Sequence, residues 1–395
     1  MEKIRQDSQL SIVREIMAEF ADLTGLSPAR ETPRRYLWTD AFAVCNFLEL
    51  YRQTSDETYK NMALLLVDQV HNILGRHRED DPRSGWISGL VEQEGKMHPT
   101  KGGLRIGKKM NERGPADPFD ERLEWERDGQ YYHYLTKWMH SLNCVSRVTG
   151  DMVYNTWAIE LAKTAHAGFT YVPFSGGQKR MYWKMSIDLS RPLIQSMGQH
   201  DPLDGFITYN QLQATADKSS QKSPDLDLNK EISDMANICQ GKTWVTDDPL
   251  GIGGLLCNAY RVVQLIIDKN FEQTNLPGVL LDSSLPGLES YVRMNHLELP
   301  ADHRLAFREL GLTIGLKAVE RLQGLIEGNP DLFNKKHPLL RTRIENLMQY
   351  APLIKTIENF WLERTSREAI SWAEHRDINM VMLATSLSPD GYLTL

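Results

Sequence analysis

The chain has 395 residues, of which 41% are hydrophobic and 25% are charged, and its formal net charge is −7. These values are those of an ordinary globular protein with enough apolar residues for a large core. A net negative charge without a strongly basic patch argues against nucleic acid or an anionic membrane surface as a partner.

The N-terminal segment MEKIRQDSQLSIVREIMAEF has no apolar signal region, and no window of about 18 uncharged apolar residues follows it. The cysteines Cys45, Cys144, Cys239 and Cys257 lie in apolar stretches without a CxxC spacing. We therefore expect a cytoplasmic protein whose cysteines are reduced core residues rather than disulfides or zinc ligands.

Helical periodicity begins near the N-terminus, where Ile12, Ile16 and Phe20 recur every four residues. The same period continues through nearly every long segment of the chain. Strand signals are short and confined to loops, as in FTYV at 169–172. The sequence therefore predicts an all-α protein.

Six unusually apolar helices are predicted to begin close to an aspartate, and Pro202 and Pro249 directly follow two of these acids. A carboxylate at a helix start accepts hydrogen bonds from free N–H groups and complements the helix dipole. A proline is tolerated at the first helical position. The six aspartates are Asp40, Asp128, Asp201, Asp248, Asp302 and Asp377.

More polar amphipathic helices alternate with these six, as outer helices alternate with buried inner ones. They are predicted near 8–24, 56–77, 151–169, 225–240, 279–294 and 338–363. Six inner and six outer helices predict one (α/α)6 toroid domain spanning residues 1–395. The segments that lead from outer to inner helices emerge on one face, and the longest, at 78–127, is predicted to be a loop insertion that walls or covers a pocket.

Residues near the predicted helix starts combine carboxylates with aromatic rings, a mixture that suits a sugar. Aromatic rings stack on the C–H faces of sugars, and sugar hydroxyls need carboxylate acceptors and Arg or His donors. The predicted catalytic residues are Glu124, Asp128, His200, Asp201 and His375. The predicted substrate-binding residues are Trp38, Asp40, Trp125, Tyr131, Tyr182, Trp183, Trp244, Asp248, Arg376 and Asp377.

Each assignment has a structural alternative, because aspartates commonly cap helices, tryptophans are commonly core residues and histidines are often structural. The helix dipole also lowers the pKa of a capping carboxylate, which favours a base over an acid. A general acid is therefore expected at a loop position such as Glu124, Asp188 or Glu374.

The loop insertion carries a local cluster of basic residues, and two interpretations are open. The cluster is either a solvated loop or a contact for an anionic sugar. Its members are Lys101, Arg105, Lys108, Lys109 and Arg113. No pair of histidines at i and i+4 appears on a helix, so we expect neither a tightly bound metal nor another cofactor.

The openings WTDAF, RDGQYYHYLTKW, QHDPLDG, DDPLGIGG and EHRDIN, set among alternating helices, resemble the six-hairpin glycosidase-like superfamily. That group includes unsaturated glucuronyl hydrolases, other (α/α)6 glycoside hydrolases and relatives of N-acylglucosamine 2-epimerase. The resemblance implies a carbohydrate pocket at the N-terminal face of the inner helices. It implies catalysis by an acidic pair in a hydrolase and by histidines in an epimerase.

Three functions follow from these observations. The first is an inverting hydrolase of a small glycoside or oligosaccharide, with water activated by Asp128 or Asp201 and carboxyl groups about 6.5–9.5 Å apart. The second is a sugar epimerase or isomerase that uses His200 and His375. The third is a carbohydrate-binding protein without catalytic activity.

Overall fold

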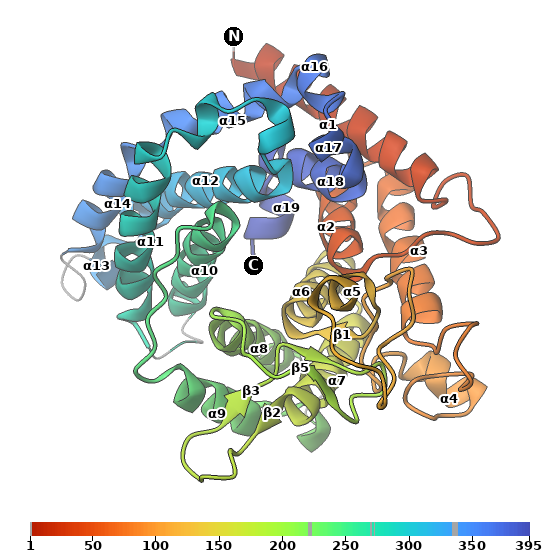
Figure 1. Ribbon diagram of the computed structural model, residues 1–395. Coiled ribbons are helices and arrows are strands. Elements are labelled where there is room, and N and C mark those ends of the chain that lie inside the picture. The colour runs from red at the N-terminus through yellow and green to blue at the C-terminus, as the bar shows by residue number, and fades with distance from the viewer. Residues whose placement is uncertain (1, 220–222, 269–270, 272, 334–338) are drawn as a thin grey trace. The chain divides into compact units, whose positions relative to one another are not determined.

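The computed structural model describes residues 2–219, 223–268, 271, 273–333 and 339–395 (Figure 1). The described residues form two compact units by their contacts. We call Ala21–Gly241 the middle unit, and Met1–Phe20 together with Lys242–Leu395 the terminal unit. In both, helices provide most of the structure, and the strands are two or three residues long.

The middle unit is built from helical hairpins that follow one another along the chain. In each pair a predicted inner helix is followed by a predicted outer helix, and α2 packs on α6, which packs on α8. The pairs are α2 (Leu37–Thr54) with α3 (Glu57–Leu74), α6 (Tyr132–Thr149) with α7 (Met152–Phe169), and α8 (Asp201–Asp217) with α9 (Asn229–Cys239).

In each of the first two hairpins, a short turn with a capping aspartate joins the two helices. Asp56 accepts a hydrogen bond from the N–H of Thr58 at 2.9 Å, and Asp151 accepts one from Val153 at 3.0 Å. These carboxylates satisfy N–H groups that have no partner within the helix. The connections from the first to the second helix of these hairpins are therefore short.

The terminal unit is also helical. Its predicted inner helices are α10, α12 and α18, and α12 packs against both α10 and α18. Gly253 allows the closest of these approaches, because a Cβ there would lie 2.0 Å from the carbonyl oxygen of Gly311. The longer helices of this unit are α1 (Glu2–Leu23), which runs on into the middle unit, α10 (Pro249–Ile267), α11 (Leu276–Arg293), α12 (Ala306–Gly328), α14 (Leu340–Met348), α15 (Pro352–Leu362) and α18 (Arg376–Leu387).

Short elements fill the connections. The short helices are α4 (Glu92–Met97), α5 (Glu121–Glu126), α13 (Pro330–Phe333), α16 (Arg364–Arg367), α17 (Ile370–Glu374), α19 (Asp390–Leu393) and the 3-10 turns η1 (Pro224–Leu226), η2 (His296–Glu298) and η3 (Ala301–His303). The strands are β1 (Gln130–Tyr131), β2 (Thr170–Tyr171), β3 (Arg180–Met181), β4 (Lys184–Met185) and β5 (Pro192–Ile194). They pair antiparallel as β1-β4-β5 and β2-β3, so the strand signal at 169–172 is confirmed.

Several predicted boundaries are wrong. The helix expected at Asp128 begins at Tyr132, because residues 130–131 pair with β4 instead. Gly129 permits this path with φ of 146°, and a Cβ there would lie 2.7 Å from the carbonyl oxygen of Met185. The helix expected near Asp302 begins at Ala306 after a 3-10 turn.

The outer helix expected at 338–363 is divided into α14 and α15, and residue 338 lies outside the described residues. Pro352 begins the second piece, where its missing N–H costs nothing.

The helix α10 is unusually apolar. Of the described helices, α10 is the one whose length and composition would suffice to cross a membrane, and 72% of that stretch is buried inside the protein. The core helix of a globular protein has the same properties, and α10 packs against both α11 and α12.

Candidate functional site

The starts of α2, α6 and α8 lie together in the middle unit. The hydroxyl groups of Tyr36 and Tyr134 are 2.7 Å apart, which joins the start of α2 to α6. His133 Nδ1 lies 3.9 Å from Asp201 Oδ1, which brings the first turn of α6 to the first turn of α8. Residues far apart in the sequence therefore meet at one end of these helices.

Asp201 is a buried carboxyl group that lacks the usual partners. Its side chain is 7% exposed, and Oδ2 has no hydrogen-bond partner among the described residues. Burial, with a smaller contribution from the charge of Asp204, raises the pKa of Asp201 to about 8. Burial thus outweighs the helix dipole, contrary to our expectation that a helix-start aspartate would be acidified. Asp201 is protonated at pH 7.

His133 is the neighbour of this acid, and its ring is enclosed by aromatic side chains. Burial, followed by the charge of Lys137, lowers the pKa of His133 to about 4, so the ring is neutral at pH 7. Nδ1 has no hydrogen-bond partner among the described residues, although 28% of the side chain remains exposed. Lys137, one turn further along α6, pairs with Asp204 at 3.1 Å.

Three of the predicted sugar-stacking residues gather beside His133. The ring of Trp183 lies 5.2 Å from that of Trp125 and 5.7 Å from that of Tyr131, and it stacks on His133 at 6.3 Å. Trp125 is 43% exposed, and the hydroxyl of Tyr131 is buried without a described partner. This aromatic cluster of Trp125, Tyr131, His133 and Trp183 offers both ring faces and polar atoms that are not satisfied.

Glu124 is held in an internal ion-pair network. Its Oε1 lies 3.0 Å from Lys184 Nζ, and its Oε2 accepts from Arg113 Nε at 2.9 Å. Glu124 is 1% exposed, and the ammonium group of Lys184 lies 5.4 Å from the centre of the Tyr131 ring. These contacts connect Glu124 to the aromatic cluster through Lys184 and do not favour the predicted role of Glu124 as general acid.

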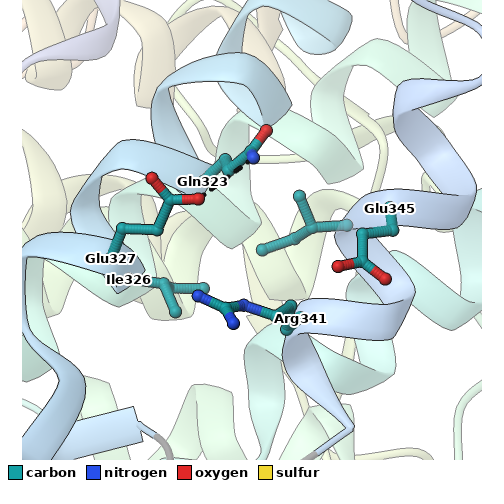
Figure 2. A pocket seen from close by; sticks show the side chains of 6 residues that line it. Gln323, Ile326, Glu327, Arg341 and Glu345 are labelled. Carbon is teal, nitrogen blue, oxygen red and sulfur yellow. Dashed lines mark hydrogen bonds between the residues drawn. The ribbon is translucent and has the colours of Figure 1, made fainter.

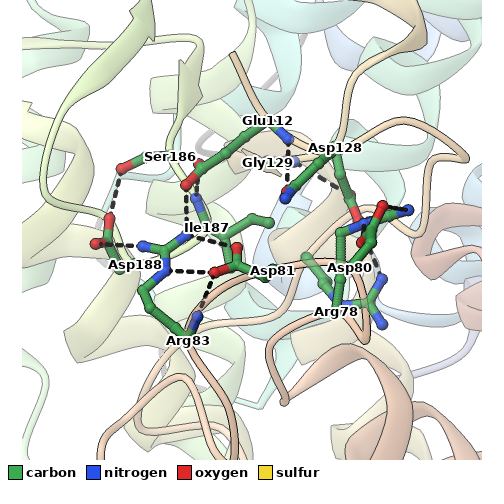
Figure 3. Close-up of polar contacts among 12 residues, drawn as sticks. Arg78, Asp80, Asp81, Arg83, Glu112, Asp128, Gly129, Ser186, Ile187 and Asp188 are labelled. Atoms are coloured by element: carbon green, nitrogen blue, oxygen red, sulfur yellow. Dashed lines mark hydrogen bonds and ion pairs between the residues drawn. The ribbon is translucent and has the colours of Figure 1, made fainter. Parts of the chain in front are cut away.

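Both carboxylate oxygens of Asp128 accept hydrogen bonds (Figure 3). Its Oδ2 accepts from Arg105 at 3.0 Å and from Arg78 at 3.4 Å. Its Oδ1 accepts from the N–H groups of Gly107 at 2.9 Å and Gly129 at 3.1 Å. The side chain is fully buried. With both oxygens used by cations and amides, Asp128 anchors the loop insertion, and its contacts do not favour a role as base.

The loop insertion is fastened to the β4–β5 hairpin by a second ion-pair network (Figure 3). Arg83 contacts Asp81 at 2.8 Å, Glu112 at 2.6 Å and Asp188 at 2.7 Å. Glu112 also accepts from the N–H of Ile187 at 2.6 Å. Burial alone would raise the pKa of Asp188, but hydrogen bonds from neighbouring serines lower it to about 2, which does not favour the predicted role of general acid.

Some members of the basic cluster predicted on this insertion form ion pairs inside the protein. Arg105 pairs with Asp128, and Arg113 pairs with Glu124. Lys108 lies over the ring of Tyr36, with 5.6 Å between Nζ and the ring centre. Two of the five cations are thus already neutralised by buried partners.

Further predicted residues of the middle unit have structural surroundings. Trp38 is buried against Phe42, with 4.5 Å between ring centres. Asp40 is 1% exposed and accepts from the N–H of Tyr36 at 2.9 Å. Tyr182 stacks on Tyr171 at 4.2 Å, which covers one face of its ring. His200 is half-buried and directly precedes Asp201 at the start of α8.

The terminal unit brings the remaining predicted residues to the starts of its own inner helices. Asp248 caps α10 and pairs with Arg308 of α12 at 2.7 Å. His375 precedes α18, and its ring lies 5.5 Å from that of Phe307 in α12.

The other three predicted residues of this unit differ in exposure and partners. Trp244 is 4% exposed, and Asp377 lies in the first turn of α18. Arg376 pairs with Glu19 of α1.

A small pocket lies between α12 and α14 (Figure 2). Its lining residues are Gln323, Ile326, Glu327, Arg341, Ile344 and Glu345. None of them is a predicted site residue, and the α12 members lie in its C-terminal half, away from its start at Ala306. The lining contains no aromatic ring, so the pocket lacks the stacking surfaces that we expected for a sugar.

In sequence, the chain matches no family model and no curated protein. In structure, it is similar to the GH76A alpha-1,6-mannanase from Salegentibacter sp. HEL1_6, with a TM-score of 0.50 and 12% identity over 96% of this chain and 99% of that one. The chain has the six-hairpin fold. The predicted all-α (α/α)6 fold class is thereby confirmed.

Other structures are similar to a lesser degree. The cellobiose 2-epimerase from Spirochaeta thermophila DSM 6192 matches with a TM-score of 0.47 and 12% identity, over 94% of this chain and 97% of that one. A sugar epimerase from a ruminal bacterium matches with a TM-score of 0.44 and 7% identity, over 89% and 87% of the two chains.

Sequence reasoning missed the residues that surround Asp201 in the six-hairpin fold. His133 and Lys137 are one helical turn apart in YYHYLTKW and therefore share a face of α6. Asp201 and Asp204 are spaced to share a face of α8 in the same way. These two spacings were visible in the sequence, but only the packing of α6 on α8 shows that the two faces meet.

Proposed function

We propose that this protein is a carbohydrate-active enzyme, a glycoside hydrolase that acts on a small glycoside or oligosaccharide with Asp201 as its general acid. The observation that carries the proposal is the unpartnered Oδ2 of Asp201, whose carboxyl group holds its proton at neutral pH beside an aromatic cluster. A general acid needs such a raised pKa, and the comparable carboxyl groups Asp128 and Glu124 are neutralised by cations.

In this proposal the carboxyl group of Asp201 donates its proton to the glycosidic oxygen as the bond to the anomeric carbon breaks. A second, ionised carboxylate is required to stabilise the positive charge on the sugar or to activate water. We assign this carboxylate to Asp204, which lies one helical turn after Asp201 in α8 and pairs with Lys137 of α6. The negative charge of Asp204 also helps to keep the proton on Asp201.

The aromatic cluster provides the proposed sugar-binding surface. Trp125 and Trp183 present ring faces to C–H groups, and the Tyr131 hydroxyl offers a hydrogen bond to a sugar hydroxyl. An anionic sugar is a weaker candidate than a neutral one, because Arg105 and Arg113 are already paired with buried carboxylates.

A sugar epimerase is the second candidate, and one observation favours it. His133 is neutral at pH 7, its Nδ1 is unpartnered, and it lies 3.9 Å from Asp201. A neutral imidazole can remove a proton from a carbon next to a carbonyl group. In this version His133 replaces the predicted pair of His200 and His375 as the base.

Incubation with a panel of sugars separates these candidates. The panel contains α-1,6-linked manno-oligosaccharides, chosen for the likeness to the mannanase, together with aryl glycosides, cellobiose and unsaturated uronides. New reducing ends identify a hydrolase, whereas a changed sugar at constant chain length identifies an epimerase. Binding without conversion of any member would contradict both catalytic proposals and leave a binding protein.

Asp201→Asn tests the assignment of the acid in either activity. We expect kcat to fall by about 10²–10⁴-fold, the usual contribution of general acid catalysis. Asp217→Asn is the matched control, because it makes the same change on an exposed residue near the other end of α8. Equal kcat values for Asp201→Asn and the wild type would remove Asp201 from the mechanism.

A further inference from the structure

A buried group of potential metal ligands lies within the middle unit. Cys45 of α2 and His140 and Cys144 of α6 place their ligand atoms within 4.8 Å of one another. His140 and Cys45 are fully buried, and Cys144 is 5% exposed. One residue thus comes from α2, and two come from successive turns of α6, which packs on it.

A chain of amide side chains connects the backbone to His140. Asn155 Nδ2 donates to the carbonyl oxygen of Leu212 at 3.2 Å, so its Oδ1 accepts from Asn143 at 2.8 Å. Asn143 Oδ1 in turn accepts from Gln211 Nε2 at 2.7 Å. Because a carbonyl oxygen can only accept, this sequence fixes the orientation of each amide.

The amide group of Gln211 lies against the ring of His140. Its Oε1 is 3.1 Å and its Nε2 is 3.0 Å from His140 Nδ1. When Nδ1 donates its proton to Oε1, the lone pair of His140 Nε2 faces the sulfur of Cys144 at 3.6 Å. A histidine that binds a metal through one nitrogen normally donates its other N–H in this way.

One distance between two of these ligand atoms matches a tetrahedral metal site. Zn–S bonds of about 2.3 Å and Zn–N bonds of about 2.0–2.1 Å place sulfur and nitrogen ligands about 3.6 Å apart. The distance between Cys144 Sγ and His140 Nε2 is 3.6 Å. Two thiolates also balance the charge of a divalent cation, which avoids the cost of burying an uncompensated charge.

We propose that Cys45, His140 and Cys144 bind a thiophilic divalent cation of the zinc class and thereby tie α2 to α6. A water molecule would complete the fourth position, as in other zinc sites with three protein ligands. Gln211 is a positioning residue that acts through His140. This site is independent of the proposed sugar chemistry, because it uses none of the residues around Asp201.

Metal content and a spectroscopic probe test the ligands. Wild-type protein is reconstituted with Zn²⁺, passed over a desalting column and assayed for zinc, and a parallel sample is titrated with Co²⁺. We expect one ion per chain and a thiolate-to-cobalt charge-transfer band that Zn²⁺ displaces. Cys45→Ser should lose the band, while Cys257→Ser, a control on another buried cysteine that is not in a disulfide, should keep it. Absence of bound zinc and of the band in the wild type would overturn the proposal.

Gln211 variants test the site without removing a ligand, and they do not depend on the fold tolerating a lost cysteine. Gln211→Met takes away the acceptor for His140 Nδ1 and should weaken Zn²⁺ binding by about 10–100-fold, as measured by competition with a chromophoric chelator. Gln211→Glu keeps an acceptor there and should restore most of the affinity. Equal affinities of the wild type and Gln211→Met would contradict the positioning role. Zn²⁺ should also raise the unfolding temperature of the wild type more than that of Cys45→Ser.

Discussion

Asp128, four residues before α6, and Asp201, the first residue of α8, are both buried aspartates that the sequence analysis treated as catalytic, yet their surroundings are opposite. Asp128 receives two guanidinium groups and two backbone N–H groups. Asp201 is nearly as buried, but its Oδ2 receives no described donor and its pKa rises to about 8. The comparison shows that donors, rather than depth, decide whether a buried carboxyl group is a fixed charge or a source of protons.

The largest effect is expected on the free energy of unfolding when Asp128 is replaced. Asp128→Ala leaves Arg105 and Arg78 without their buried partner and should lower the free energy of unfolding by about 3–5 kcal/mol. The measurement is a urea unfolding curve, with Asp217→Ala as a control that should stay within about 0.5 kcal/mol of the wild type. A loss below about 1 kcal/mol for Asp128→Ala would show that its ion pairs do not anchor the loop insertion.

The pH dependence of stability should reveal Asp201. Its pKa is raised in the folded protein, so its contribution is fully present below the unfolded pKa near 4 and is lost as pH rises toward about 8. Between pH 5 and pH 7 the wild type should lose on the order of 2–3 kcal/mol relative to Asp201→Asn. Urea midpoints of both proteins at the two pH values measure this difference, and parallel pH profiles would rule out the raised pKa.

The neighbours of Asp201 should move its titration in opposite directions. The charge of Asp204 raises the pKa of Asp201, and the charge of Lys137 lowers it. Asp204→Asn also loses the proposed second carboxylate, so its profile is read from the residual activity, where the basic limb should shift to lower pH. In the activity–pH profile of Lys137→Met the basic limb should shift to higher pH. Each shift should be below about one pH unit, since both charges are minor compared with burial. Shifts in the same direction would assign that limb to another group.

The smallest effect is expected at the start of α10, where the pair between Arg308 and Asp248 is partly exposed. The side chains are 42% and 33% exposed, so solvent screens their attraction. Arg308→Ala should cost at most about 1 kcal/mol in a urea unfolding experiment. A cost comparable to that of Asp128→Ala would show that exposure is a poor guide to the strength of these pairs.

The fold was predictable because it depends on features that repeat along the chain. The signals are local: helical periodicity, acids at helix starts, and a proline directly after an acid, as at Asp248 and Pro249. The helices α8 and α10 begin where these signals predict. The false start at Asp128 has a non-local cause, since β1 exists only because β4, more than fifty residues later, pairs with it.

The candidate site was less predictable, because partners distant in sequence determine what each acid does. Nothing near Glu124 in the sequence indicates that Lys184 will neutralise it, and nothing near Asp201 indicates that its Oδ2 will lack a donor. The proposed metal ligands were overlooked for another reason. We looked for two histidines one turn apart, whereas α6 carries a histidine and a cysteine at that spacing and takes its third ligand from α2.

The membership of α1 in the terminal unit has a consequence for synthesis on the ribosome. Met1–Phe20 is made before Ala21–Gly241, yet its unit is completed only by Lys242–Leu395, which is made after Ala21–Gly241. Ala21–Gly241 can finish packing its own core while the chain is still being extended. The apolar side of α1 must then stay protected until residues 242–395 have emerged from the ribosome.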